Sequence, residues 1–189
     1  MRKIDTKNQE DKRKRRNQWI LSVFLVVIMF FSVLGYGFMG NSRKSNTNVE
    51  YNGFEFAEQN GFWNLNLGNL NFVFRYNPKE TENISSQVNY LNSYSEKPLY
   101  IYSENNEASS EVYINLNQMA QRIQSACLDG YECSENVPIK TCEDNFIIIS
   151  ESNETNIIQE NNCVFILGPY ENLTMMSDVF LFKVLGVEE

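Results

Sequence analysis

Residues 50–76 read EYNGFEFAEQNGFWNLNLGNLNFVFRY, and polar and apolar side chains alternate through three parts of this stretch. Alternation with a period of two is typical of β-strands that are buried on one face. Asn60-Gly61 and Gly68-Asn69 separate the three parts, and Gly and Asn accept the positive φ that two-residue hairpin turns need. The stretch therefore predicts a β-meander.

After the meander, the chain predicts a strand–helix–strand–strand–helix unit. Short apolar strands are expected at 98–103, 146–149 and 163–167. A helix is expected to begin at Ser109 or Ser110 and to end before Gly130, because six residues follow helical spacing: Val112, Leu116, Met119, Ala120, Ile123 and Cys127. A second helix is expected from Glu171 to Leu185, followed by Gly186. Together these elements predict an α+β (mixed α/β) fold in one domain.

Upstream of this domain lies an uncharged apolar run, Trp19–Met39, with the sequence WILSVFLVVIMFFSVLGYGFM. A helix of this length extends about 30 Å, which is the thickness of the hydrocarbon layer of a bilayer. Such a helix also satisfies its own backbone polar groups in lipid. We therefore predict a transmembrane helix at residues 18–39, with Trp19 and Tyr36 as interfacial aromatic side chains near its ends.

Two other interpretations of the apolar run stay open. It could be a buried core helix, although few such helices are apolar on every face over this length. It could also be the apolar part of a cleaved signal peptide, with Gly35-Tyr36-Gly37 as a small-residue cleavage site. That part of a signal peptide usually has only about 7–15 residues.

The charged side chains are divided unevenly along the chain. Of 16 basic and 24 acidic residues, residues 1–17 carry eight basic and three acidic ones, whereas residues 45–189 carry six basic and 21 acidic ones, a net charge of −15. The cluster KRKRR at 12–16 directly precedes the apolar run, and basic flanks stay in the cytoplasm. We therefore predict a basic cytoplasmic segment at 1–17, a linker at 40–49 and an extracytoplasmic globular domain at 50–189, in a single-pass protein of the cell membrane.

The four cysteines all lie in the predicted outer domain, at Cys127, Cys133, Cys142 and Cys163. An even number of cysteines in an oxidising compartment favours disulfides. Of the three possible pairings we favour Cys127–Cys133 with Cys142–Cys163, which would close one loop and join the starts of two strands. A zinc site and a redox site stay open as weaker alternatives, because the sequence has neither two close cysteine pairs nor a C-x-x-C motif.

Three Asn-x-Ser/Thr sequons, at Asn83, Asn153 and Asn172, are possible glycosylation sites if the domain is extracytoplasmic. Histidine is absent from the chain, which excludes His-based acid–base catalysis and His metal ligation by these residues. Phosphate-binding Gly motifs, G-x-S-x-G and a D-x-D-x-D-G calcium loop are absent too. We therefore predict no catalytic, cofactor-binding or metal-binding residues and no enzyme activity.

Several motifs of the outer domain resemble those of uncharacterised small archaeal membrane-anchored proteins. They are YNGFEF (51–56), NGFW (60–63) and FRYNP (74–78), followed by CVFILG (163–168), Ser177-Asp178 and LGV (185–187). The resemblance implies a single-pass membrane topology and carries no biochemical role.

These observations predict a membrane-anchored binding protein whose partners are the lipid bilayer, through residues 18–39, and an unknown envelope protein or glycan, with no nucleic acid. One alternative is an envelope glycan hydrolase, with Glu143 or Asp144 paired with Glu151. The other is a pilin-like surface subunit, because pilins also place a long apolar helix before a β-rich head.

Overall fold

The computed structural model describes residues 7–39, 47–131, 133 and 136–188, and it divides the chain into two units, Met1–Ser45 and Asn46–Glu189. The second unit contains the predicted outer domain. Its first strand begins at Asn48, inside the stretch 40–49 that the sequence predicts as a linker. The remainder of that linker, 40–46, lies outside the described residues.

The first unit contains one long helix, α1 (Lys7–Met39). Its side chains are described from Arg15 to Ser32, and all of these are exposed. Within the residues that the structure describes, no helix has both the length and the apolar character that crossing a membrane requires. The predicted span, 18–39, extends past Ser32, the last side chain described in this helix.

The predicted meander forms a four-stranded antiparallel sheet in the order β1-β2-β3-β4, with bounds Asn48–Tyr51, Phe54–Gln59, Phe62–Leu67 and Leu70–Phe74. The first part of the stretch, predicted as one strand, is a hairpin of β1 and β2. Its turn is Asn52-Gly53, where φ is 48° and 82°. The same type of turn, with positive φ at both residues, joins β2 to β3 at Asn60-Gly61.

The second half forms a five-stranded sheet in the order β10-β11-β9-β5-β6. Four of its strands are parallel, β5 (Pro98–Ser103), β6 (Arg122–Ser125), β9 (Asn145–Glu151) and β11 (Cys163–Gly168), and β10 (Asn156–Glu160) is an antiparallel edge strand. A short parallel pair, β7 (Cys127–Leu128) and β8 (Ile139–Lys140), follows β6. The predicted strands at 98–103, 146–149 and 163–167 are confirmed, and β6, β7, β8 and β10 were not predicted.

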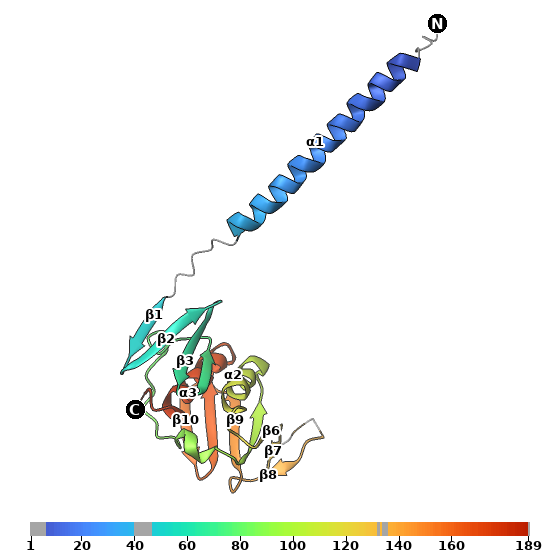
Figure 1. The fold of residues 1–189 in the computed structure, drawn as a ribbon. Coiled ribbons are helices and arrows are strands. Elements are labelled where there is room, and N and C mark those ends of the chain that lie inside the picture. Colours follow the sequence, from blue (N-terminus) through green and yellow to red (C-terminus); the bar gives the residue numbers. More distant parts are fainter. Residues whose placement is uncertain (1–6, 40–46, 132, 134–135, 189) are drawn as a thin grey trace. The chain divides into compact units, whose positions relative to one another are not determined.

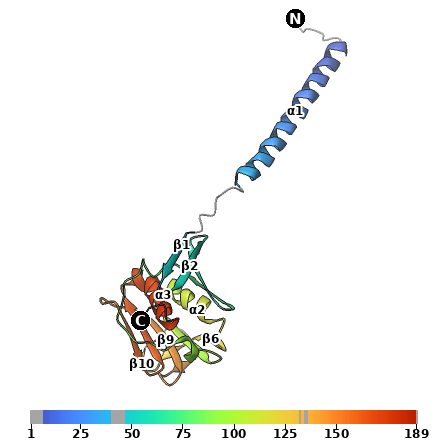
Figure 2. The same ribbon diagram turned by 60° about the vertical axis from the view of Figure 1, so that its left-hand side comes forward.

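Two helices, α2 (Asn106–Leu116) and α3 (Leu173–Val184), lie between the two sheets (Figures 1 and 2). Two short 3₁₀ helices, η1 (Leu91–Ser93) and η2 (Tyr170–Asn172), precede β5 and α3. The Phe182 ring of α3 lies 5.7 Å from the Phe56 ring and 4.8 Å from the Phe74 ring, so α3 packs directly on the meander. The α+β architecture is therefore confirmed, with a helical layer that forms the centre of one core.

The first predicted helix is wrong beyond Leu116. α2 begins earlier than expected, where the Asn105 side chain accepts hydrogen bonds from the backbone N–H of Glu107 and of Ala108, and it ends at Leu116. Ile123 and Cys127, which follow the helical spacing, belong to strands β6 and β7. The second predicted helix is confirmed, with η2 as its first turn and Gly186 at a φ of 71° beyond its end.

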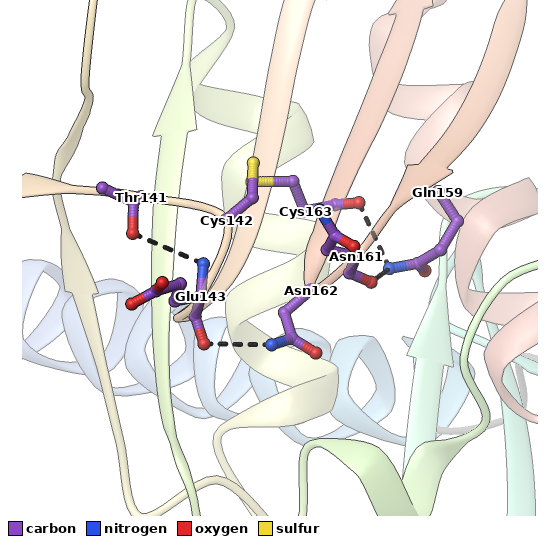
Figure 3. Close-up of a disulfide and its surroundings, with 7 residues drawn as sticks. All are labelled: Thr141, Cys142, Glu143, Gln159, Asn161, Asn162 and Cys163. Carbon is purple, nitrogen blue, oxygen red and sulfur yellow. Dashed lines mark hydrogen bonds between the residues drawn. A yellow bond between two sulfur atoms is a disulfide. The ribbon is translucent and has the colours of Figure 1, made fainter.

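The structure contains two disulfides, Cys127–Cys133 and Cys142–Cys163, the pairing that the sequence favours. Cys163 is fully buried at the start of β11, on the sheet face opposite the helices, beside Tyr100, Phe146 and Ile148. Figure 3 shows how the second disulfide is supported: the Asn162 side chain donates to the Glu143 carbonyl at 2.9 Å, and Gln159 donates to the Asn161 carbonyl at 2.7 Å. The cysteines are structural residues in this arrangement.

We expect the two disulfides to contribute unequally to stability. Cys142–Cys163 closes a separation of 21 residues and Cys127–Cys133 one of six, and the entropy removed from the unfolded chain grows with loop length. Replacing both cysteines of a pair by Ala should cost about 3 kcal/mol for the longer loop and about 2 kcal/mol for the shorter one. Denaturant unfolding of the two double variants under non-reducing conditions measures this difference. A larger loss for the shorter loop would contradict it.

Candidate functional site

Two adjoining cavities lie along strand β6, on the side that faces α2. The first has a volume of about 320 Å³ and is lined by residues at the carboxyl ends of β5 and β6 and at the start of α2, and by Cys133 and Val137 between β7 and β8. The second has a volume of about 300 Å³ and continues beside α2. Ile101, Ser109 and Ser125 line both cavities. We call this continuous depression the β6 groove. The carboxyl ends of parallel strands are the usual position of binding sites in sheets of this kind.

The chain between β5 and α2 holds one end of the β6 groove in a fixed shape. The Ser103 hydroxyl donates to the Asn105 carbonyl at 2.7 Å, and the Asn105 backbone N–H donates back to that hydroxyl at 3.1 Å. The Asn105 side chain, which caps α2, also donates to the Tyr170 carbonyl at 3.2 Å. The Asn105 side chain also accepts from the N–H groups of Glu107 and Ala108, so these two groups of the first turn of α2 already have an acceptor within the protein.

Glu104 provides the acidic side chain of the first cavity. Its carboxylate accepts a hydrogen bond from the Glu151 backbone N–H at 2.6 Å, and its own N–H donates to the Ile149 carbonyl at 3.0 Å. Burial raises the pKa of the neighbouring Tyr102 phenol, and the Glu104 carboxylate raises it further. The Tyr102 ring also lies 6.4 Å from the Tyr131 ring. In the first cavity, the carboxylate of Glu104 is therefore held in place, with the Tyr102 ring and the Ser103 and Ser109 hydroxyls among the other lining groups.

The second cavity is more apolar. Tyr113 and Ile114 of α2 line it and are 48% and 56% exposed, and Ile123 of β6 lines the opposite side. Exposed apolar side chains beside an acidic cavity can hold an apolar and a basic group of one ligand. Among the described residues, no group of three or more Cys, Asp or Glu side chains is placed to hold a metal ion. The arrangement is that of a binding surface.

The structure separates the carboxylates that the hydrolase alternative requires. Glu143 and Asp144 precede β9, and Glu151 is its last residue. A strand of this length spans about 20 Å, whereas paired glycosidase carboxylates lie about 5–9 Å apart. These residues are not brought together, and the alternative has no support from them.

The three sequons lie at separate places on the outer domain. Asn153 is exposed in the turn between β9 and β10, Asn172 is half-buried at the start of α3, and Asn83 is exposed. Asn83 also lines a polar cavity of about 460 Å³ together with Tyr51 and Glu188. Glycosylation at these residues stays a prediction.

A pair of acidic side chains from distant segments does converge, at Glu111 of α2 and Asp178 of α3, but it is buried and lines none of the cavities described above. Asp178 accepts hydrogen bonds from the backbone N–H groups of Arg75 and Tyr76 at 3.0 and 2.9 Å, and its second oxygen has no hydrogen-bond partner among the residues that the structure describes. Burial raises the pKa of Asp178 well above its usual range, and the Glu111 carboxylate adds to this. The Arg75 guanidinium bridges to Glu111 at 3.4 Å and to Glu107 at 2.8 Å. The cluster ties the end of β4 to both helices.

Comparison of this chain with protein-family models, with curated proteins and with solved structures finds no match. The sequence did not identify the β6 groove, because most of its lining residues are common Ser, Tyr and Ile side chains from β5, α2 and β6, joined by Cys133 and Val137 from the chain between β7 and β8. One usable signal was a strand that ends at Ser103, two residues before the capping Asn105.

We expect the outer domain to lose stability as the pH rises above the ordinary carboxyl pKa. Burial raises the pKa of Asp178, Glu111 and Glu188, so the folded state binds more protons than the unfolded state. Their stabilising contribution is complete below the ordinary carboxyl pKa and is lost as the pH passes the raised values. The melting temperature of the full chain in detergent micelles should therefore fall as the pH is raised from below the ordinary carboxyl pKa through the raised pKa values.

Asp178→Asn tests which carboxyl causes this dependence. The amide oxygen can still accept from the Arg75 and Tyr76 N–H groups, but the side chain no longer titrates. The fall in melting temperature with pH should be clearly smaller in this variant. Asp129→Asn, at an exposed position, is the matched control and should follow the parent protein. An unchanged pH dependence in Asp178→Asn would show that Asp178 is not responsible.

Proposed function

We propose that this chain is a single-pass, membrane-tethered binding protein whose extracytoplasmic domain binds a partner of the cell envelope in the β6 groove. The observation that carries the proposal is the groove itself, two adjoining cavities with an acidic end and an apolar end beside the outermost strand of the sheet. The partner is an envelope protein or a glycan, and we expect no nucleic acid, because the outer domain has a net charge of −15.

The apolar side chains of α1 support the tether. From Trp19 to Phe31 the large apolar side chains have exposed fractions between 43% and 76%. Exposed apolar area costs about 25 cal/mol per Å² in water, and a bilayer removes that cost while the helix satisfies its own backbone. The tether at residues 18–39 also agrees with the proposed likeness to archaeal membrane-anchored proteins.

The basic cluster 12–16 and the disulfides support the same orientation. Basic flanks remain in the cytoplasm, and disulfides persist in oxidising compartments outside it. The two disulfides of the outer domain are consistent with a position beyond the membrane. In this proposal the amino terminus is cytoplasmic and the domain from Asn48 onward is extracytoplasmic.

We expect the full chain to stay with the membrane pellet after carbonate extraction, and we expect protease added to intact cells to cut its outer domain. Replacing Leu25 and Ile28 together by Arg should release the chain from the membrane, since each charge at the centre of a spanning helix costs about 2.5–3.5 kcal/mol. Immunoblotting of membrane and soluble fractions measures this.

The matched control is Leu25→Ile with Ile28→Leu, which keeps the apolar character and should leave the chain in the membrane fraction. Recovery of the unaltered chain as a soluble protein with four reduced thiols would overturn both the tether and its orientation.

A further inference from the structure

We propose that the turn Asn60-Gly61 is a site of spontaneous deamidation, and that the matching turn Asn52-Gly53 is protected from the same reaction by a hydrogen bond to Val187. This inference does not depend on the proposed binding function. Its support comes from two turns that share their sequence and their backbone form but differ in one tertiary hydrogen bond.

The two turns are a matched pair within the meander. They contain the two Asn-Gly pairs of the chain, and a phenylalanine follows each of them. The first turn joins β1 to β2 and the second joins β2 to β3. The value of φ is 48° at Asn52 and 82° at Gly53, and it is 56° at Asn60 and 81° at Gly61. All four residues are exposed, so water reaches both turns.

Deamidation of an Asn-Gly pair is an intramolecular substitution that needs only water as a second reactant. The backbone nitrogen of Gly61 loses its proton and bonds to Cγ of Asn60, while the Cγ–Nδ2 bond breaks and the side-chain nitrogen leaves as ammonia. Water then adds to one carbonyl of the cyclic imide, and a ring C–N bond breaks to give an aspartyl or an isoaspartyl residue. Glycine favours the attack because it has no Cβ to shield its nitrogen.

The Asn60 side chain is free to reach its neighbour's nitrogen. Within the part of the chain that the structure describes, no hydrogen bond holds its amide group. The Gly61 N–H is not needed to close the turn, because a two-residue hairpin is closed by the residues that flank it, here Gln59 and Phe62. The reaction therefore requires a local rotation of the Asn60 backbone and side chain that breaks no tertiary contact of this side chain.

At Asn52 the same rotation breaks a tertiary hydrogen bond. The Nδ2 group of Asn52 donates to the Val187 carbonyl at 2.9 Å, and Val187 is only 1% exposed. Water therefore competes poorly for this acceptor, and breaking the bond leaves a buried carbonyl unpaired. We expect this cost to make deamidation at Asn52 at least about tenfold slower than at Asn60.

The isoaspartyl product changes the meander, because it leads the main chain through Cβ and Cγ and so lengthens a turn of two residues. This turn sets the register in which Gln59 lies opposite Phe62, and Phe56 of the same strand packs on the Phe182 ring of α3. We therefore expect the isoaspartyl chain to unfold at a lower temperature than the parent. Asn60→Asp, which adds the charge without lengthening the turn, should change the melting temperature much less.

The test incubates the full chain in detergent micelles in a mildly alkaline buffer, since the attacking nitrogen must lose its proton, and follows both turns by mass spectrometry. Cleavage after glutamate places the turns on separate peptides, because Glu55 and Glu58 lie between them. Digestion in heavy-oxygen water marks any deamidation that occurs after the chain has been unfolded. We expect Asn60 to be converted at least about tenfold faster than Asn52, with isoaspartate among its products.

The same chain, unfolded in denaturant with its disulfides reduced, is the matched control. The hydrogen bond to Val187 is absent there, and the two Asn-Gly-Phe sequences should react at nearly equal rates. Asn60→Gln should remove the fast site, because a glutamine side chain closes the larger ring far more slowly, and should leave the slow rate at Asn52 unchanged. Asn66→Gln, at an exposed position that no glycine follows, should leave both rates as in the parent.

Equal rates at the two turns of the folded chain would overturn the protection by Val187. A difference that persists in denaturant would overturn it too, because the difference would then come from the local sequence. If Asn60 reacts in denaturant and not in the folded chain, the turn itself prevents the reaction and the proposed site is removed. Thermal unfolding before each incubation establishes that the parent chain and its variants are folded.

Discussion

The burial of α3 is the constraint on which the outer domain depends. Eleven of the twelve residues from Leu173 to Val184 are buried, so this helix has no face left for water. Phe182 contacts the meander, and Met176 lies 3.6 Å from the position of a Cβ at Gly168, on β11 of the other sheet. A helix that is buried on every face needs other elements of the fold to cover both of its sides. Neither sheet alone can bury α3, and the two sheets therefore form one cooperative core.

Polar contacts inside this layer fix how the meander sits on the helices. Asp178 accepts the two N–H groups that follow β4, and Asn115 pairs with the backbone of Val73 as a further strand would. Leaving such buried groups unpaired costs about 1–3 kcal/mol each, so a shift of β4 along the helices is unfavourable. The same contacts close the edge of β4.

The sequence correctly predicted those helices and strands whose form is set by residues close to them in the chain. The meander hairpins, the strands β5, β9 and β11, and α3 with its terminal Gly186 all follow from local patterns. The end of α2 did not, because Ile123 reaches the same core from a strand and therefore repeats the helical spacing by coincidence. Asn52-Gly53 is a two-residue hairpin signal, and both residues have positive φ. It was missed because apolar and polar side chains alternate on both sides of it, which is also the pattern of one longer strand. The groove could not be predicted at all without the crossover that places β6 beside β5.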